Sequence, residues 1–329
     1  MIWWTKSWNP VIGCTKCSPA CENCYAEALH TQRHKALLAG RQVAACYSKP
    51  FGQVQFLPVR LVEPTHWIKP QRIFVGNMGD LFHEDVEEAW LDAIFTFIAL
   101  CCRHTFMLLT KRPERAQEYL SRPDFLMRLV EYGQQRWGHE GGVMVLGQIQ
   151  GLQVLPNVWL GTTIWDQPSL ERNMPILLST PAARRFVSVE PMLGPVDFSV
   201  LRHGSDHDLP VFGTEWGPDW VICGGETGPG ARPMHPDWPR SLRDQCQAAG
   251  VPFFFKQWGE WAPHLPELSY NNPATGGKAW GCIDHAGVWM PETTPFNGDR
   301  GDYEWPMVRV GTRRAGRVLD GRTWEEVPA

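Results

Sequence analysis

The chain has 329 residues, of which 43% are hydrophobic and 20% charged, so it has ordinary globular composition with enough apolar side chains for a large core. Its formal net charge of −4 excludes a globally basic protein, and a nucleic-acid partner would need a local basic patch. The N-terminus lacks the apolar segment of a signal peptide, and no stretch reaches the roughly 18 apolar residues of a membrane span. The sequence therefore predicts a cytoplasmic protein with no membrane partner and with reduced thiols.

Apolar runs of strand length alternate with helical patterns along most of the chain. A short first strand is predicted near 7–13, and a helix begins at about 24. Further strands are predicted within 72–82, 104–113, 157–164, 184–192, 219–228 and 251–260, and further helices within 87–102, 113–122, 169–180 and 235–250. Alternation of this kind predicts an α/β fold with parallel strands and helical crossovers.

A doubly wound sheet and a barrel both fit this alternation, and the strand ends favour a barrel, closed or open. Polar residues recur where the predicted strands end, and such ends converge on one face of a barrel, whereas a doubly wound sheet would concentrate them near one crevice. These residues are Asn77, Asp80, Thr110, Lys111, Arg112, Thr162, Thr163, Glu190, Glu226, Lys256 and Gln257.

Three stretches fit the repeat poorly. Residues of about 36–70 and 134–156 are predicted to be insertions, the second rich in Gly and Gln. Residues 263–329 form a C-terminal extension rich in Pro, Gly and Asn, which we interpret as a lid or a substrate-binding lobe. The barrel is therefore assigned to residues 1–262.

Four cysteines, Cys14, Cys17, Cys21 and Cys24, lie in the stretch "GCTKCSPACENCY" with the spacing C-x2-C-x3-C-x2-C. In a reducing compartment such a group indicates metal binding or catalysis rather than disulfides. Zinc sites of four cysteines usually separate two C-x2-C pairs by a longer loop, whereas an iron–sulfur cluster accepts crowded thiolates because each meets a different iron. The spacing favours a cluster over zinc, with incidental thiols as a third possibility.

Cys17, Cys21 and Cys24 also form C-x3-C-x2-C, the pattern of radical S-adenosylmethionine (SAM) enzymes, in which three cysteines bind three irons and SAM binds the fourth. The cysteines lie between the first predicted strand and a helix, the same place as the cluster loop of those enzymes. Together with "SVEPMLGP", "GGETGPGARPMHPDW" and "FFFKQWGEW", the stretch resembles the phage-encoded three-cysteine-motif family, which is radical-SAM-like and related to spore photoproduct lyase. The resemblance runs from about residue 4 to 262.

The resemblance implies a partial (β/α)6-type radical SAM barrel with a [4Fe–4S] cluster that produces a 5′-deoxyadenosyl radical from SAM. The family pattern maps the ligands onto Cys14, Cys21 and Cys24, and the regular pattern replaces Cys14 by Cys17. The implied substrate is a nucleic-acid base, best an amino-acid-modified thymidine rearranged from N-linked to C-linked during phage DNA hypermodification in an infected host cell. Alternatives are a thymine-lesion repair lyase and a non-enzymatic zinc or cluster module. The implied partners are DNA or a modified nucleoside, and an electron donor such as flavodoxin or ferredoxin.

Candidate site residues follow from this resemblance and from the strand ends. Gly224-Gly225-Glu226 resembles the motif that binds the methionyl amino group, although it follows a later strand than usual. Asp80 is either a ligand contact or a helix cap, and Lys111 and Arg112 either bind a carboxylate or phosphate or form surface ion pairs. Lys256 is predicted to face the substrate, and Cys223 is the candidate hydrogen donor of the lyase alternative. The remaining candidate SAM contacts are Asn77, Thr162, Thr163 and Glu190.

Overall fold

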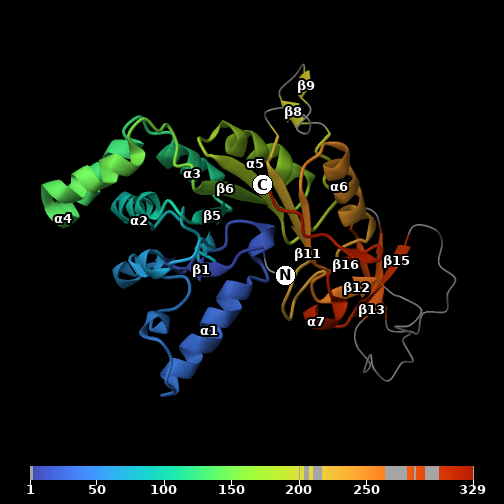
Figure 1. Ribbon diagram of the computed structural model, residues 1–329. Helices are drawn as coiled ribbons and strands as arrows, with labels where there is room; N and C mark the ends of the chain where they lie inside the picture. Colours follow the sequence, from blue (N-terminus) through green and yellow to red (C-terminus); the bar gives the residue numbers. More distant parts are fainter. Residues whose placement is uncertain are drawn as a thin grey trace.

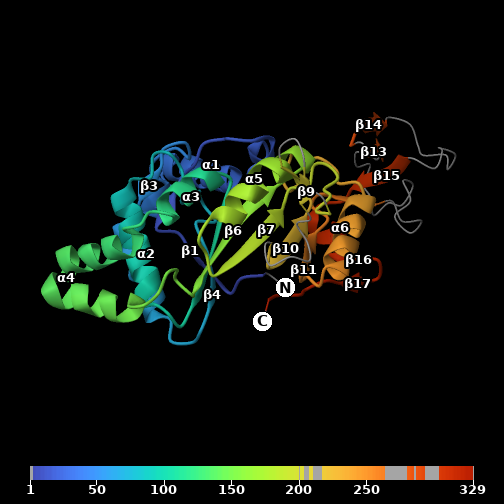
Figure 2. The ribbon, with the colours of Figure 1, turned by 90° about the horizontal axis from the view of Figure 1, so that it is seen from above.

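The computed structural model describes residues 3–199, 201–203, 207–209, 217–263, 280–284, 287–292 and 304–328. Seven of the described strands form a parallel sheet that curls into an open half-barrel (Figure 1, Figure 2). Across the sheet their order is β1 (Lys6–Trp8), β4 (Arg72–Val75), β5 (Thr105–Thr110), β6 (Val158–Ile164), β7 (Arg184–Val189), β10 (Trp220–Gly224) and β11 (Phe253–Gln257).

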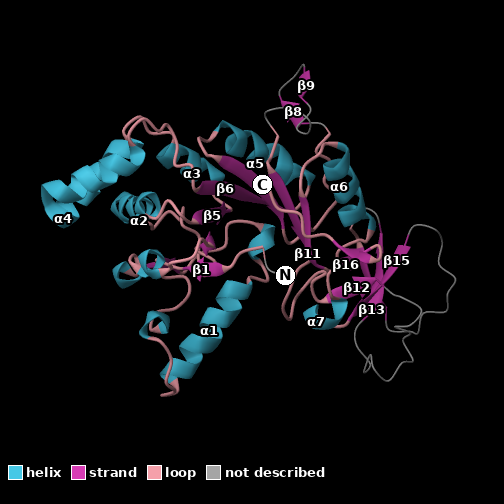
Figure 3. Cartoon of the chain, in the orientation of Figure 1, coloured by secondary structure: helices cyan, strands magenta, loops and turns pink. Residues whose placement is uncertain are grey.

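The strand order follows the chain order without a reversal, which distinguishes this sheet from a doubly wound one. Because parallel crossovers are right-handed, strands added in one direction place their helices on one face. Figure 3 shows the larger helices around the outside of the curled sheet. They are α1 (Tyr25–Leu38), α2 (Glu88–Leu100), α3 (Pro113–Leu120), α4 (Phe125–Ile149), α5 (Gln167–Ser179) and α6 (Asp237–Ala248). The predicted α/β class with parallel strands is confirmed, and the sheet is an open half-barrel.

The two faces of the sheet are buried in different ways. Residues such as Val75, Leu108 and Val221 point outward into the main core beneath the helices. The inward positions form a separate aromatic cluster, composed of Trp3, Phe74, Met107, Phe186, Trp220, Ile222 and Phe254. Towards the carboxyl ends of the strands, the inward positions change to Thr163, Ser188 and Lys256. The inside of the half-barrel is therefore filled with aromatic rings towards one end and is lined by polar side chains at the carboxyl ends of the strands.

The C-terminal extension forms a second sheet and then returns to the barrel. Four described strands pair antiparallel in the order β12 (Trp261–Pro263), β15 (Glu304–Arg309), β13 (Trp280–Asp284) and β14 (Trp289–Glu292). They are followed by α7 (Thr312–Ala315), β16 (Val318–Leu319) and β17 (Arg322–Thr323). Phe255 N–H then donates to the carbonyl of Trp324 at 3.0 Å, so the last residues cover the β11 edge. The predicted boundary at 262/263 falls inside β12.

The stretches predicted as insertions contain short, regular elements. Within 36–70, β3 (Gln55–Phe56) pairs antiparallel with β2 (Val11–Ile12), beside the 3-10 turns η2 (Ala45–Tyr47), η3 (Pro58–Arg60) and η4 (Glu63–His66). Most of 134–156 belongs to α4, which the sequence analysis did not predict. α4 folds back at Gly138 (φ 75°) into a helical hairpin, in which a Cβ on Gly141 would lie 2.4 Å from the carbonyl oxygen of Gly133.

A small hairpin of β8 (Leu201–His203) and β9 (His207–Leu209) lies between β7 and β10 in the chain. None of the helices in the described part of the chain has both the length and the apolar character needed to cross a membrane.

Candidate active site

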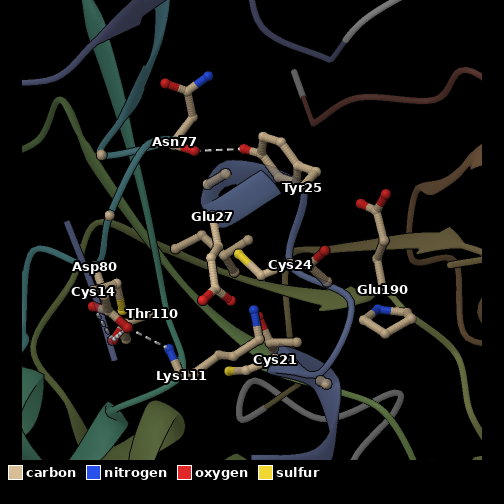
Figure 4. A pocket seen from close by; sticks show the side chains of 18 of the residues that line it. Cys14, Cys21, Cys24, Tyr25, Glu27, Asn77, Asp80, Thr110, Lys111 and Glu190 are labelled. Carbon is tan, nitrogen blue, oxygen red and sulfur yellow. Dashed lines mark hydrogen bonds between the residues drawn. The ribbon is translucent and has the colours of Figure 1, made fainter. Parts of the chain in front are cut away.

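A cavity of about 380 Å³ opens at the carboxyl ends of the parallel strands, where barrels place their sites. Its walls come from the loops after β4, β5, β7 and β10 and from the inward side chains of β6 and β11. Much of the remaining wall is the stretch 13–24, which we call the cysteine loop. We call this space the barrel cavity, and Figure 4 shows the side chains that line it.

Two glycines set the start of the cysteine loop. Gly13 has φ 94°, and a Cβ there would lie 2.7 Å from the carbonyl oxygen of Gln53. A Cβ on Gly79 would lie 2.7 Å from the carbonyl oxygen of Gly13, and these two glycines form a parallel bridge. Only glycine fits such a close backbone approach, and it brings the following residue, Cys14, to the edge of the cavity. The loop then forms the 3-10 turn η1 (Pro19–Cys21), and α1 begins after Cys24.

Three of the four clustered cysteines line the barrel cavity. They are Cys14, which lies beside Asp80, and Cys21 and Cys24 (Figure 4). Cys17 is exposed and lies on the other side of the loop, with its Sγ 4.0 Å from the Sγ of Cys21. Among the described residues, no group of His, Cys, Asp and Glu side chains is arranged to hold a single metal ion.

The thiols differ in acidity. Burial raises the pKa of the Cys14 thiol to about 11. The hydrogen bond between the thiols of Cys17 and Cys21 raises the pKa of Cys17 and lowers that of Cys21. Because a thiol binds metal as the thiolate, binding at Cys14 would release its proton.

Arg112, which follows β5, holds the first half of the cysteine loop. Its Nη2 donates to the carbonyl oxygen and to Oγ1 of Thr15, both at 3.1 Å, and its Nη1 lies 3.5 Å from the Sγ of Cys14. Behind it lies Asp80, which is 6% exposed and 3.5 Å from Nη1. Asp80 also accepts hydrogen bonds from Oγ1 of Thr110 and from the backbone N–H of Lys111. Both candidate SAM contacts are thus occupied in supporting the loop.

A second ion pair holds the other half of the loop. Glu226, which is 5% exposed, accepts from Arg232 and from Nδ2 of Asn23 at 3.0 Å. Arg232 Nη2 donates to the carbonyl oxygen of Pro19 at 2.9 Å, and its Nη1 lies 3.3 Å from Glu22. The "GGE" motif therefore reaches the cavity edge, but its carboxylate is bonded to protein groups.

The strands β7 and β11 contribute an ion pair to the cavity wall. Lys256 Nζ lies 2.7 and 2.9 Å from the two carboxylate oxygens of Glu190, and the same Nζ lies 5.6 Å from the ring centre of Trp4. Lys256 thus lines the cavity with Glu190 as its partner, and its contact with a substrate stays a prediction.

Three buried polar atoms in the cavity wall have no hydrogen-bond partner among the described residues. They are Asn77 Oδ1, Thr163 Oγ1 and Ser188 Oγ. A buried polar group without a partner is costly, and these three atoms belong to residues that line the cavity. Next to them, Tyr25 donates to the carbonyl oxygen of Asn77 at 2.6 Å (Figure 4).

Besides Cys17, the structure leaves three predicted site residues outside the barrel cavity. Cys223 is fully buried and points outward into the main core, with its Sγ 3.7 Å from Sδ of Met192, and burial raises its pKa well above the ordinary value. Thr162 also points away from the cavity and donates to the carbonyl oxygen of Thr110. Gly224 lies behind Glu190, and a Cβ there would lie 3.3 Å from Cδ of Glu190. The predicted site residues that do line the barrel cavity are Cys14, Cys21, Cys24, Asn77, Asp80, Lys111, Arg112, Thr163, Glu190, Gly225, Glu226 and Lys256.

The sequence analysis missed several residues of the site. Tyr25, Asn23 and Ser188 line the cavity, and Arg232 supports it from outside. Tyr25 directly follows Cys24, a position that signals proximity to the site. Arg232 lies in the "GPGAR" run after Glu226, but nothing in that run indicates that its side chain reaches the cysteine loop.

We expect Gly225→Ala to lower the free energy of unfolding by about 1–3 kcal/mol. A Cβ on Gly225 would lie 2.0 Å from the carbonyl oxygen of Trp258, which is rigid backbone. Urea unfolding measures the change. Gly52→Ala is the matched control, because a Cβ there meets nothing within 4 Å. Equal stability of the two variants would contradict the close contact between the loops after β10 and β11.

Comparison with known proteins adds one match. A family model described as "Protein of unknown function (DUF5131)" matches residues 1–328. No curated protein and no solved structure matches the chain.

Proposed function

The chain belongs to the DUF5131 family of proteins of unknown function, and we propose that it is a radical SAM enzyme built on a partial (β/α)6-type barrel. In this proposal Cys14, Cys21 and Cys24 hold a [4Fe–4S] cluster. The observation that carries it is the placement of these three thiols in one cavity at the carboxyl ends of the strands. Three thiolates suit a cluster that keeps one iron free for a ligand.

The remaining cavity residues fit a polar ligand beside the cysteines. Reduced and bound to SAM, such a cluster supplies the 5′-deoxyadenosyl radical. The unpartnered atoms of Asn77, Thr163 and Ser188 would bind the polar groups of SAM. Lys256 would bind a carboxylate, with Glu190 fixing its position. The buried rings of Trp3 and Phe74 close the cavity floor and exclude water.

For the substrate we propose a nucleic-acid base, best an amino-acid-modified thymidine that the enzyme isomerises. The aromatic floor of Trp3 and Phe74 suits a base, since rings stack on aromatic side chains. The lesion-lyase alternative needs a cysteine or tyrosine as hydrogen donor at the substrate. The Cys223 thiol is fully buried and points away from the cavity, so Tyr25, which lines the cavity, would be the donor in that alternative.

Anaerobic reconstitution with iron and sulfide tests the proposal. We expect a brown protein with about four irons per chain, which cleaves SAM to 5′-deoxyadenosine and methionine when dithionite is added. A colourless protein that holds one zinc ion and leaves SAM intact would overturn it. Mass spectrometry of DNA that carries the modified base then separates the two reactions, because an isomerase changes the fragmentation but not the mass of the nucleoside.

A further inference from the structure

A second hollow lies on the other side of the cysteine loop. It has a volume of about 460 Å³ and lies between this loop, the loop after β5 and the helix α5. Cys17 and Trp165 line it, and Lys111 and Arg112 line both this hollow and the barrel cavity. We call it the outer groove. One side of the cysteine loop thus faces the proposed ligand cavity, and the other faces the outer groove.

The outer groove is positively charged, although the whole chain is not. Among the described residues that line it, the cations outnumber the acids by four to two, which gives +2 in a chain of net charge −4. They are Lys111, Arg112, Arg115 and Arg172 against Glu84 and Glu114.

Two of these cations are available to a partner. Arg172 is exposed, stacks over the ring of Trp165 at 5.2 Å and donates from Nε to Oδ1 of Asn173 at 3.0 Å. Lys111 is half-buried, and neither cation forms an ion pair with another described residue. A buried aromatic ring next to cations that have no ion-pair partner is typical of a surface that binds an acidic partner.

The outer groove also reaches close to a proposed cluster ligand. Cys17 is exposed in it, and its Sγ lies 4.0 Å from the Sγ of Cys21. A carrier seated there would be separated from a cluster ligand by one side chain. On its other side the loop borders the barrel cavity, which a bound ligand would fill.

We propose that the outer groove docks an acidic one-electron carrier protein of the flavodoxin or ferredoxin class. This inference rests on the proposed function. The reduced carrier gives up one electron, which passes by way of Cys21 to the oxidised cluster; no bond or proton moves. Because the attraction is between exposed charges, the rate falls as ionic strength rises.

Arg172→Glu tests the docking without touching the barrel cavity. In anaerobic stopped-flow mixing with reduced flavodoxin, we expect the second-order rate of cluster reduction to fall about tenfold at low salt. Reduction by dithionite, which needs no docking, should be unchanged. The matched control is Arg136→Glu on α4, because Arg136 is another exposed arginine that stacks on a tryptophan, Trp137. Flavodoxin should reduce the cluster of this control at the wild-type rate.

The outcomes separate the two proposals. The docking site would be overturned if flavodoxin reduced Arg172→Glu and Arg136→Glu at equal rates, or if Arg172→Glu were slowed as much with dithionite as with flavodoxin. Either result would leave the proposed function intact. Loss of duplex-DNA binding in Arg172→Glu with an unchanged flavodoxin rate would assign the outer groove to a nucleic-acid backbone instead. A wild-type protein that loads no cluster would overturn both proposals.

Discussion

Replacing Cys14, Cys21 or Cys24 with alanine is expected to abolish cluster loading, whereas Cys17→Ala is expected to retain about four irons per chain. Each ligand thiolate binds a different iron. A [4Fe–4S] cluster that loses one of its three cysteines therefore has an additional iron without a protein ligand. Cys17 is directed into the outer groove, while the other three cysteines line the barrel cavity. Iron and sulfide assays after reconstitution measure the effect, together with the visible absorption spectrum.

The regular C-x3-C-x2-C pattern makes the opposite prediction for two of these variants. If Cys17, Cys21 and Cys24 were the ligands, Cys17→Ala would lose its iron and Cys14→Ala would keep it. Cys102→Ala serves as the control, because Cys102 is an exposed cysteine outside the cluster. Iron retained by every variant would show that these thiols do not hold a cluster at all.

The sequence predicted most of the site because strand ends are visible in it. Residues such as Asn77, Lys111, Glu190 and Lys256 follow apolar runs, and parallel strands bring such ends to one edge. It is harder to predict to which side of the sheet a residue of a buried strand points. Cys223 lies in a run that is apolar on both sides, so alternation gives no sign of whether it points into the barrel or towards the helices.

The partners of charged residues could not be predicted for a different reason. Glu226 ends the "GGE" motif and Asp80 follows a predicted strand, and both positions suggest ligand binding. Their cationic partners, however, contact residues that are far away in the sequence. Arg232 reaches Pro19 across 213 positions, and Arg112 reaches Thr15 across 97. Likewise, the glycines of α4 suggest a loop, whereas they permit two helical segments to pack closely.

These ion pairs change the interpretation of two candidate SAM contacts. Asp80 and Glu226 each lie behind an arginine that holds the cysteine loop, one at each end of it. Their carboxylates are nearly fully buried and already accept several hydrogen bonds. We therefore expect their substitution to disturb the loop before it disturbs any ligand.

Asp80→Asn is expected to lower the free energy of unfolding by about 3 kcal/mol and to reduce iron loading as well. The amide has the shape of the carboxylate, but it carries no charge to balance Arg112, whose side chain is 11% exposed. Its NH2 group would also face the N–H of Lys111 or the hydroxyl of Thr110, both of which donate to Asp80. Urea unfolding of the metal-free protein gives the stability change without any contribution from the cluster.

Asp85→Asn is the matched control for this substitution. Asp85 has a 64% exposed side chain and lies 3.8 Å from Nδ1 of His83, so its stability change should stay within about 0.5 kcal/mol. If Asp80→Asn unfolded at the same urea concentration as this control but failed to bind SAM, Asp80 would be a ligand contact and not a support of the loop. If it unfolded earlier and lost iron, whereas SAM bound to the fraction that still held a cluster, the buried pair would have the supporting role that its contacts indicate.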